Sequence, residues 1–152
     1  MSVPSSLPNV HATAIVAGDR GLAILGPSGS GKTTLAAALV DRFSRQGAFS
    51  RLVGDDQLFA EARGGRLVVR VPAAIAGLAE VPGIGPQPAP FEQAAVIDLL
   101  VRLVPAAAAE RLQDRGTEEL AGCVLPSLRL AERDVTAALP AVVAVLRRFC
   151  AG

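Results

Sequence analysis

Apolar and polar positions along this chain recur in patterns that predict strands and helices. Residues 9–16 alternate, residues 17–20 have the composition of a turn, and residues 21–25 form a short apolar run that ends at a glycine. This order is typical of a β-hairpin whose second strand is buried. Residues 31–45 carry apolar side chains at helical spacing and are rich in strong helix formers, which predicts a helix.

The middle of the chain predicts further strands. Residues 51–56 form a short strand that ends in two acids, and residues 57–63 and 66–71 alternate on either side of a Gly-Gly pair, a strong hairpin signal. Proline opens residues 72–79, where we expect a short helix. Residues 80–86 have the composition of a rigid glycine and proline loop.

The last part of the chain gives a weaker pattern until its end. Residues 94–103 are apolar and partly β-branched, which favours a buried strand, although the pattern alone leaves a helix open. Residues 110–119 are polar and charged, and residues 124–130 are mixed. A terminal helix is predicted from Asp134, with apolar positions on one face and Pro140 as a kink or restart.

Composition narrows the class of protein. The chain has 152 residues, 51% of them hydrophobic, with no Trp or Tyr and five Phe, so one domain with an aliphatic core is expected. The formal net charge is +1 with both signs mixed along the sequence, so the chain shows no electrostatic footprint for nucleic acid, and we expect no nucleic-acid partner. We expect an α/β fold with a mixed β-sheet and flanking helices.

The chain has no segment that predicts export or a membrane span. Its first residues lack the basic flank and apolar core of a signal peptide, and no apolar run reaches about 18 residues. Cys123 and Cys150 lack metal-ligand spacing, which favours free thiols in a reducing compartment over a disulfide. We therefore predict a cytoplasmic protein without a membrane partner.

Residues 26–33 read Gly-Pro-Ser-Gly-Ser-Gly-Lys-Thr and match the phosphate-binding pattern G-x-x-x-x-G-K-[ST]. Glycines let the backbone curl so that N–H groups point at phosphate oxygens, and the following helix directs its positive end to the same anion. Lys32, the only lysine among 15 basic residues, adds a full charge, and the Thr33 hydroxyl suits Mg²⁺. The predicted strand before and helix after supply the context that the pattern requires.

A single P-loop nucleotide-binding domain is therefore predicted over residues 10–152, after a flexible lead-in over residues 1–9. The residues expected to bind the nucleotide lie in the loop and at the start of its helix: Gly26, Pro27, Ser28, Gly29, Ser30, Gly31, Lys32, Thr33 and Thr34.

Acidic residues and a histidine near this loop are candidates for chemistry. P-loop enzymes use a carboxylate at the end of a neighbouring strand to hold Mg²⁺ or to orient the attacking group, as Asp55 and Asp56 would do. Adjacent strand residues point to opposite faces, so the two acids should have different roles. His11, the only histidine, precedes the loop by one predicted strand, and Glu80 begins the glycine and proline loop. From position alone, an acidic turn, a structural histidine and a surface glutamate fit as well.

Taken in order, His11, residues 26–33, residues 52–56 and residues 77–85 resemble the catalytic domain of the HPr kinase/phosphorylase family, over residues 10–86. That bacterial family phosphorylates a serine of HPr, the phosphocarrier protein of the sugar phosphotransferase system, and also removes the phosphate with inorganic phosphate. The chain is most similar to the short alphaproteobacterial forms that lack the family's N-terminal domain. The resemblance implies ATP and Mg²⁺ as cofactors, an HPr-like phosphocarrier protein as substrate, and a homo-oligomer, a hexamer.

The resemblance also implies residue roles. Asp55 would take the proton from the substrate serine, His11 would lie near Asp55 and set its protonation, and Asp56 would act on the metal or the geometry. Glu80 would act through the metal. The implied catalytic set is Asp55, His11 and Lys32, and the implied metal set is Thr33, Asp56 and Glu80.

The chain departs from the family at three places. Thr34 stands where the family more often has an acid, and Pro82 where it usually has an arginine near the transfer site. The family's further catalytic arginine and its HPr-docking helices are not recognisable in residues 87–152. We therefore expect serine kinase activity and leave phosphorylase activity open.

Two other functions fit the same loop. A small-molecule P-loop kinase would need a lid with several arginines, for which Arg63, Arg66 and Arg70 are the candidates. A non-catalytic nucleotide-binding regulator would keep the loop and lack phosphoryl transfer.

Overall fold

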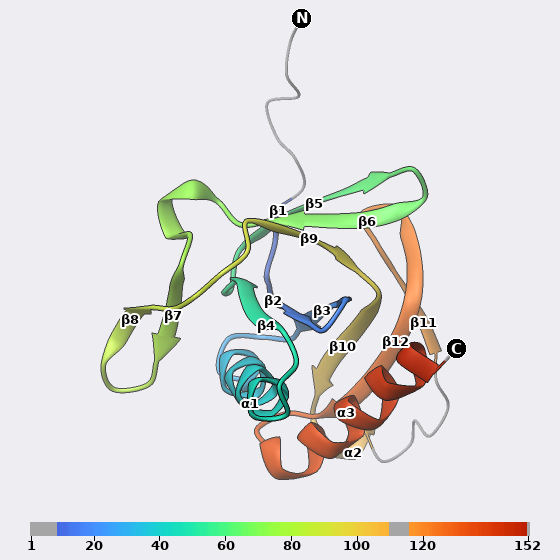
Figure 1. Cartoon of the computed structure of the whole chain (residues 1–152). Helices are drawn as coiled ribbons and strands as arrows, with labels where there is room; N and C mark the ends of the chain where they lie inside the picture. The colour runs from blue at the N-terminus through green and yellow to red at the C-terminus, as the bar shows by residue number, and fades with distance from the viewer. Residues whose placement is uncertain (1–8, 110–115, 152) are drawn as a thin grey trace, which may run out of the picture.

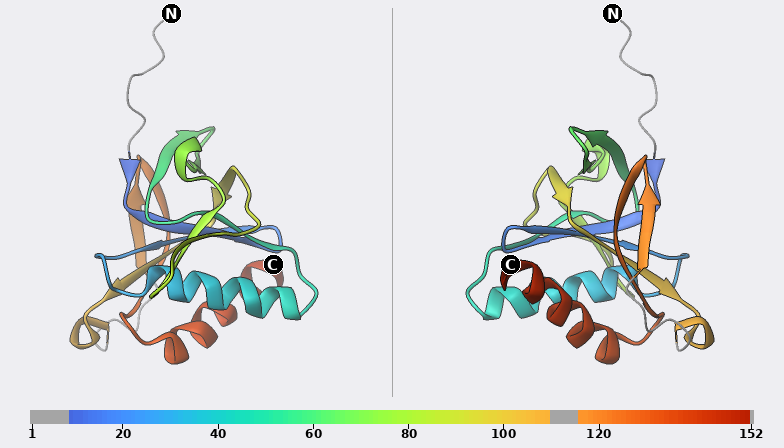
Figure 2. Two further views of the ribbon diagram at one scale, coloured as in Figure 1. Left: turned by 90° about the vertical axis from the view of Figure 1, so that its left-hand side faces the viewer. Right: turned by 90° about the vertical axis from the view of Figure 1, so that its right-hand side faces the viewer.

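Successive residues of the central strands are buried on opposite faces of the sheet, which explains why the chain folds into three layers. In β3 (Arg20–Leu25), Leu22 and Ile24 pack toward the helices, whereas Ala23 and Leu25 pack toward a second sheet. A strand buried on both faces needs a layer on each side. The computed structural model describes residues 9–109 and 116–151, with side chains up to Arg148. Figures 1 and 2 show helices on one side of a central sheet and a smaller sheet on the other.

The central sheet has six strands, in the order β11-β12-β10-β3-β2-β4. Besides β3, its strands are β2 (Ala12–Ala17), β4 (Ser50–Gly54), β10 (Leu99–Val104), β11 (Gly116–Leu120) and β12 (Cys123–Ala131). β10 pairs in parallel with β3 and with β12, and the other neighbours are antiparallel. The predicted mixed sheet and the hairpin before the glycine-rich loop are confirmed.

Two long helices cover one face of this sheet. The two long helices are α1 (Lys32–Arg45) and α3 (Val135–Ala151), and a short helix, α2 (Ala106–Ala109), follows β10. Leu35 and Leu39 of α1 and Val142 and Leu146 of α3 join one buried cluster with side chains of β2, β3 and β10. The predicted helices at 31–45 and from Asp134 are confirmed, with Pro140 inside α3. Among the described residues, no helix is long and apolar enough to cross a membrane.

A four-stranded antiparallel sheet covers the other face. Its order is β1 (Asn9–Val10), β5 (Leu58–Arg63), β6 (Arg66–Arg70) and β9 (Ala94–Ile97). Leu58, Leu67 and Ile97 are buried against Ala23 and Leu100 of the central sheet. Asn9, expected in the lead-in, pairs with Phe59, and residues 1–8 of that lead-in lie outside the described residues. Cys123 is a buried free thiol, and the side chain of Cys150 is outside the described part.

The single strand predicted over 94–103 is wrong, because the chain turns at Asp98. β9 and β10 belong to different sheets, and Asp98 joins them at a corner. Its carboxylate accepts a hydrogen bond from the Gly21 N–H at 2.9 Å, and its own N–H donates to the Gly21 carbonyl at 2.8 Å. The acid in the apolar run is therefore the residue that ends one strand and starts the next.

The segment after Pro72 also differs from its prediction. Only one 3₁₀ turn, η1 (Ala73–Ile75), replaces the helix expected over 72–79. The expected loop over 80–86 is a hairpin of β7 (Leu78–Val81) and β8 (Gly85–Pro88), which projects beside α1 (Figure 1). The glycine and proline residues that indicated a loop form its tight turn, which the Ile84 N–H closes on the Val81 carbonyl.

A β-bulge in β4 turns Asp55 toward α1. Ala14 pairs with Gly54 and Ile15 pairs with Leu52, so Val53 is an extra residue in β4. Leu52 packs with the helices, and in a regular strand the residue three positions later would face the opposite side. The extra residue shifts the alternation by one, which returns Asp55 to the side of α1.

Replacing Gly54 by alanine should destabilise the fold. The added Cβ would lie 2.5 Å from Leu58 Cδ2 and 3.0 Å from Val71 Cγ2, and both side chains are buried. We expect Gly54→Ala to lower the free energy of unfolding by about 1–3 kcal/mol, measured by urea denaturation. Gly116→Ala, in β11 with no atom within 4 Å of the added carbon, is the control. Equal stability of the two variants would contradict the close packing at Gly54.

An ion pair ties β11 to β10 across β12. Arg102 Nε lies 3.0 and 3.1 Å from the two carboxylate oxygens of Glu118, and Arg102 Nη2 lies 2.6 Å from Glu118 Oε2. The hydrogen bonds from Arg102 hold the pKa of Glu118 below its usual value; burial opposes them, and the charges of Arg102 and Arg129 lower the pKa further. The same hydrogen bonds raise the pKa of Arg102.

Stability should depend on pH through Glu118. Because its folded pKa is lowered, the pair stabilises the fold above the unfolded value of about 4.3, and this stabilisation is lost as the pH falls through the folded pKa. Since 38% of the Arg102 side chain is exposed, water screens the pair, and we expect Glu118→Gln to cost about 0.5–1 kcal/mol at pH 7. Urea denaturation from pH 7 to pH 3 should show this difference vanish in acid. Glu119→Gln, at its exposed neighbour, is the control; a difference for Glu118→Gln that persists in acid would contradict the assignment.

Candidate functional site

A cavity of about 520 Å³ lies between the glycine-rich loop, the end of β4 and the β7–β8 hairpin. It collects most of the residues predicted for the site. From the loop and helix come Ser28, Gly29, Gly31, Lys32, Thr33 and Thr34, and from elsewhere Asp55, Asp56 and Glu80. Its far wall is apolar, from Ile75, Leu78, Pro82 and Pro86. Of the other predicted residues, Gly26 and Pro27 contact Lys32, Ser30 is buried in the loop, and His11 contacts Asp56.

The glycine-rich loop, residues 26–31, joins β3 to α1 and leaves the first helical turn open. Gly29 (φ 80°) and Gly31 (φ 98°) have left-handed backbone conformations, which glycine adopts without strain. Among the described residues, no side chain caps α1, and its first turn holds no acid. The N–H groups and positive end of α1 are therefore available to an anion in the cavity.

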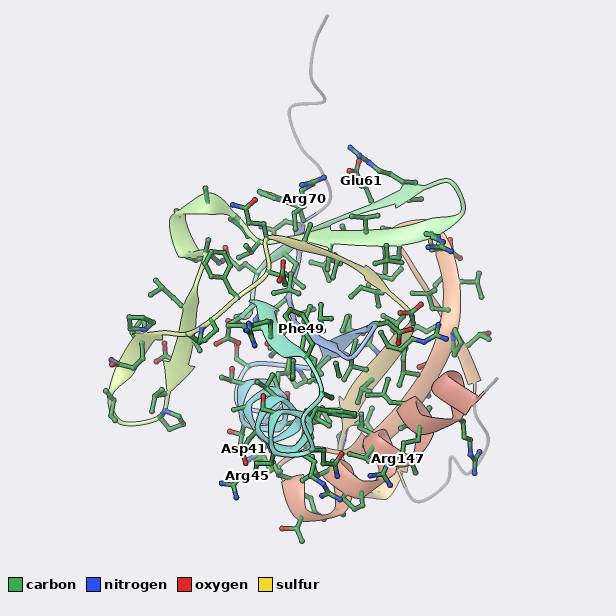
Figure 3. All side chains as sticks on the ribbon, in the orientation of Figure 1. Asp41, Arg45, Phe49, Glu61, Arg70 and Arg147 are labelled. Carbon is green, nitrogen blue, oxygen red and sulfur yellow. The ribbon has the colours of Figure 1, made fainter. Side chains whose placement is uncertain are left out.

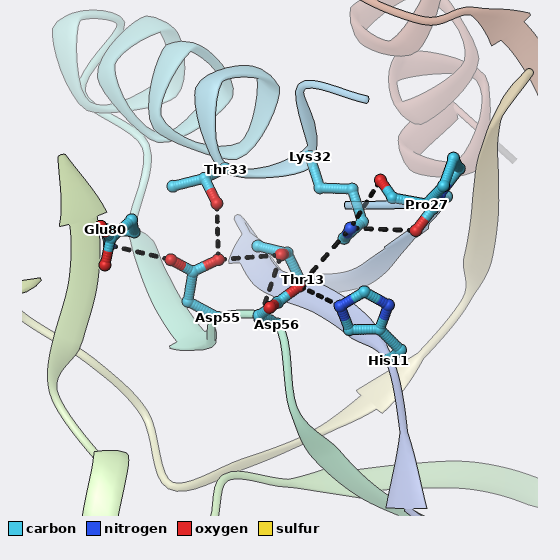
Figure 4. Close-up of polar contacts among 9 residues, drawn as sticks. His11, Thr13, Pro27, Lys32, Thr33, Asp55, Asp56 and Glu80 are labelled. Carbon is cyan, nitrogen blue, oxygen red and sulfur yellow. Dashed lines mark hydrogen bonds and ion pairs between the residues drawn. The ribbon is translucent and has the colours of Figure 1, made fainter. Parts of the chain in front are cut away.

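Lys32 is held at the entrance of this loop. Its Nζ donates to the carbonyls of Gly26 at 2.9 Å and Pro27 at 3.2 Å, and it lies 3.5 Å from Asp56 Oδ1 (Figure 4). Only 4% of the side chain is exposed. A buried ammonium needs such partners, and here they hold the charge beside the open helix end.

Asp55 is a buried carboxylate that accepts three hydrogen bonds. Thr13 Oγ1 donates to Oδ1 at 2.9 Å, Thr33 Oγ1 donates to Oδ1 at 2.8 Å, and the Glu80 N–H donates to Oδ2 at 2.9 Å. The donors come from β2, α1 and β7, so the carboxylate connects three elements. Because Thr33 gives its proton to Asp55, the lone pairs of its hydroxyl oxygen are left for another ligand.

Asp56 is exposed and has different neighbours. Its backbone has φ 71°, and 55% of its side chain is exposed. Its Oδ1 lies 2.5 Å from His11 Nε2 and 3.5 Å from Lys32 Nζ. His11, between β1 and β2, therefore contacts Asp56, and its expected effect on the protonation of Asp55 stays a prediction. The two aspartates have distinct neighbours, but both line one cavity, so the opposite faces expected from strand alternation are wrong.

Glu80 reaches the site through its backbone. Its N–H binds Asp55, while its residue is exposed at the cavity wall. Among the described residues, no group of three or more His, Cys, Asp or Glu side chains could hold a metal ion. Mg²⁺ needs fewer protein ligands, since it keeps several waters and binds substrate phosphates with one or two protein oxygens. The Thr33 hydroxyl beside Asp55 fits that requirement.

Two residues at the site were missed by sequence reasoning. Thr13 is fully buried and contacts both aspartates, and its only signal was a polar residue inside an otherwise apolar strand. Arg133 lies beside the loop, where its N–H donates to the Ser30 carbonyl at 2.9 Å. About a hundred positions separate it from the loop, and its side chain, 71% exposed, belongs to no motif.

The fold and the site can now be compared with known proteins. No protein-family model matches the chain, and no curated protein matches its sequence. Among solved structures, the HPr(Ser) kinase/phosphatase from Coxiella burnetii superposes with a TM-score of 0.76 at 22% sequence identity, over 95% of this chain and 99% of that chain. The chain therefore has the fold of that kinase/phosphatase, and the expected resemblance is confirmed at the level of the fold. It extends well beyond residues 10–86.

The two aspartates should differ in their effect on stability. In Asp55→Asn, the new amide –NH₂ group is a hydrogen-bond donor that would face another donor, either the Glu80 N–H or the two threonine hydroxyls. A hydroxyl can rotate to accept a hydrogen bond, but the backbone N–H of Glu80 cannot. We expect Asp55→Asn to lower the free energy of unfolding by about 1–3 kcal/mol and Asp56→Asn to change it by less than about 0.5 kcal/mol, in urea denaturation. Similar losses in both variants would contradict this geometry.

Proposed function

We propose that this chain is an ATP-dependent serine kinase that acts on an HPr-type phosphocarrier protein. The observation that carries the proposal is that the open end of α1, Lys32 and Asp56 line one cavity, with His11 in contact with the Asp56 carboxylate. A fold shared with an HPr(Ser) kinase/phosphatase supports the same class of reaction. Phosphoryl transfer needs mainly positioning, counter-charge and one base, and these residues are suited to supply all three.

The loop and the start of α1 would bind the nucleotide phosphates. Their N–H groups would contact the phosphate oxygens, and Lys32 would exchange its loop carbonyls for the transferred phosphate. The Thr33 oxygen would hold Mg²⁺, with Asp55 fixing that hydroxyl and Glu80 at the cavity wall. The ion would neutralise charge on the phosphates.

The geometry favours Asp56, rather than the expected Asp55, as the group that takes the serine proton. All three hydrogen bonds to Asp55 come from fixed groups, so its carboxylate has little freedom to accept a substrate proton. Asp56 is exposed to the cavity, and His11 orients its carboxylate. In the proposed reaction, Asp56 accepts the serine hydroxyl proton as the serine oxygen bonds to the γ-phosphorus. The bond from that phosphorus to the bridging oxygen breaks, and ADP leaves.

The alternatives gain less support. Arg66 and Arg70 are exposed on the second sheet, where Arg70 points away from the body (Figure 3), and Arg63 pairs with Glu61. None of these arginines lines the cavity, so the arginine lid of a small-molecule kinase is not favoured. Apolar Pro82 lines the cavity, and phosphorylase activity stays open. The cytoplasmic location, the hexamer and the flexible lead-in remain predictions from the sequence.

Transfer of labelled γ-phosphate from ATP to purified HPr-type carrier proteins tests the proposal. We expect label on a carrier serine, and a loss of about 100-fold or more in rate for Lys32→Ala and Asp56→Asn, because counter-charge and base are removed. Asp55→Asn should need more Mg²⁺ and recover part of its rate at high Mg²⁺, unlike Asp56→Asn.

Asp19→Asn, at a side chain that is 82% exposed and does not line the cavity, is the matched control and should keep the wild-type rate. Bound ATP without label on any carrier would contradict the kinase and favour the regulator. Full activity of Asp56→Asn together with an inactive, Mg²⁺-insensitive Asp55→Asn would return the base to Asp55.

A further inference from the structure

Thr13 is the one polar residue of strand β2, whose other residues are apolar. It lies in β2 with 0% exposure, and Ala12, Ala14 and Ile15 around it are equally buried. A hydroxyl in such surroundings is costly unless its hydrogen bonds are satisfied. Its partners therefore indicate why a polar residue is present.

The Thr13 hydroxyl contacts both aspartates at once. It donates to Asp55 Oδ1 at 2.9 Å and accepts from the Asp56 N–H at 3.3 Å (Figure 4). A hydroxyl has one proton and two lone pairs, so the two bonds are compatible. Valine has nearly the same shape and can make neither bond.

These two bonds act on the conformation that separates the aspartates. Asp56 has φ 71°, a left-handed conformation that is uncommon outside glycine, and its N–H is held by Thr13. In this conformation the Asp56 carboxylate meets His11 and Lys32, while Asp55 turns to Thr33. The Thr13 hydroxyl thus supports the orientation of both carboxylates, that of Asp56 toward His11 and that of Asp55 toward Thr33.

We propose that Thr13 is a positioning residue that holds Asp56 toward His11 and Asp55 toward Thr33. The inference rests on the proposed function for the reaction that this geometry serves. Without the hydroxyl, Asp55 loses one of three donors and the Asp56 N–H loses its partner. Both carboxylates are then free to shift, and small displacements of reacting groups slow transfer strongly.

Three variants test the role in phosphoryl transfer. We expect Thr13→Val to lower kcat by about 10- to 100-fold with little change in the KM for ATP, and Thr13→Ser, which keeps the hydroxyl, to stay near wild type. Thr117→Val, at an exposed threonine of β11, is the matched control and should be unchanged. Combined with Asp56→Asn, Thr13→Val should add less than its full single loss, because the part of its effect that acts through the Asp56 carboxylate is already gone, whereas the part that acts through Asp55 remains.

A second readout needs no enzymatic activity. His11 is the single histidine, so its ring ¹⁵N chemical shifts can be followed in the free protein. Thr13→Val should shift these signals in the same direction as Asp56→Asn does, and Thr13→Ser should leave them in place. Wild-type His11 signals in Thr13→Val, or a Thr13→Ser variant as impaired as Thr13→Val, would overturn the inference. If the wild type transfers no phosphate, the proposed function is wrong, but the inference about Thr13 is not thereby overturned. The His11 signals would then decide whether Thr13 positions Asp56.

Discussion

The buried carboxylate of Asp55 is the constraint on which the site depends. A charge removed from water must be satisfied by hydrogen bonds, and Asp55 takes them from a strand, a helix and a hairpin that are far apart in sequence. Thr13, Thr33 and the Glu80 backbone are thereby drawn to one point. Any arrangement that moved α1 or the β7–β8 hairpin away would leave this carboxylate short of donors, so the same interaction that forms the cavity also stabilises its walls.

Irregular backbone makes this interaction possible. Val53 is the extra residue of a bulge, and without it the alternation of β4 would direct Asp55 into the apolar layer between the two sheets. The next residue is a glycine, Gly54, because a side chain at this position would collide with Leu58 and Val71. Asp56 then leaves the strand with a left-handed backbone that turns its carboxylate to the cavity side. Regular strand geometry would have given two acids on opposite faces of a sheet; the bulge and the turn give two acids in one site.

The sequence pattern predicted correctly those elements that interactions between neighbouring residues determine. The helix at 31–45, the hairpin around Gly64 and the loop before α1 follow from periodicity and glycine chemistry. The corner at Asp98 was not predicted, because an apolar run that is buried on both faces does not indicate which sheet each of its halves joins. The contact of His11 with Asp56, the bulge at Val53 and the approach of Arg133 to Ser30 depend on register and on distant pairing, which residue type and spacing do not encode.

The shape of the cavity bears on the kind of acceptor. Its far wall consists of Ile75, Leu78, Pro82 and Pro86, and Ile84 at the hairpin turn is 69% exposed. A small polar metabolite would need several charged or polar side chains to fix its hydroxyl, and on this side of the cavity Glu80 is the one charged or polar residue among the described lining residues. Among the lining residues in the described part of the chain the one cation is Lys32, and it faces the loop rather than the wall. An apolar wall beside an exposed apolar turn is better matched to a protein surface that presents its serine among apolar residues, which favours the protein kinase proposed here over a small-molecule kinase.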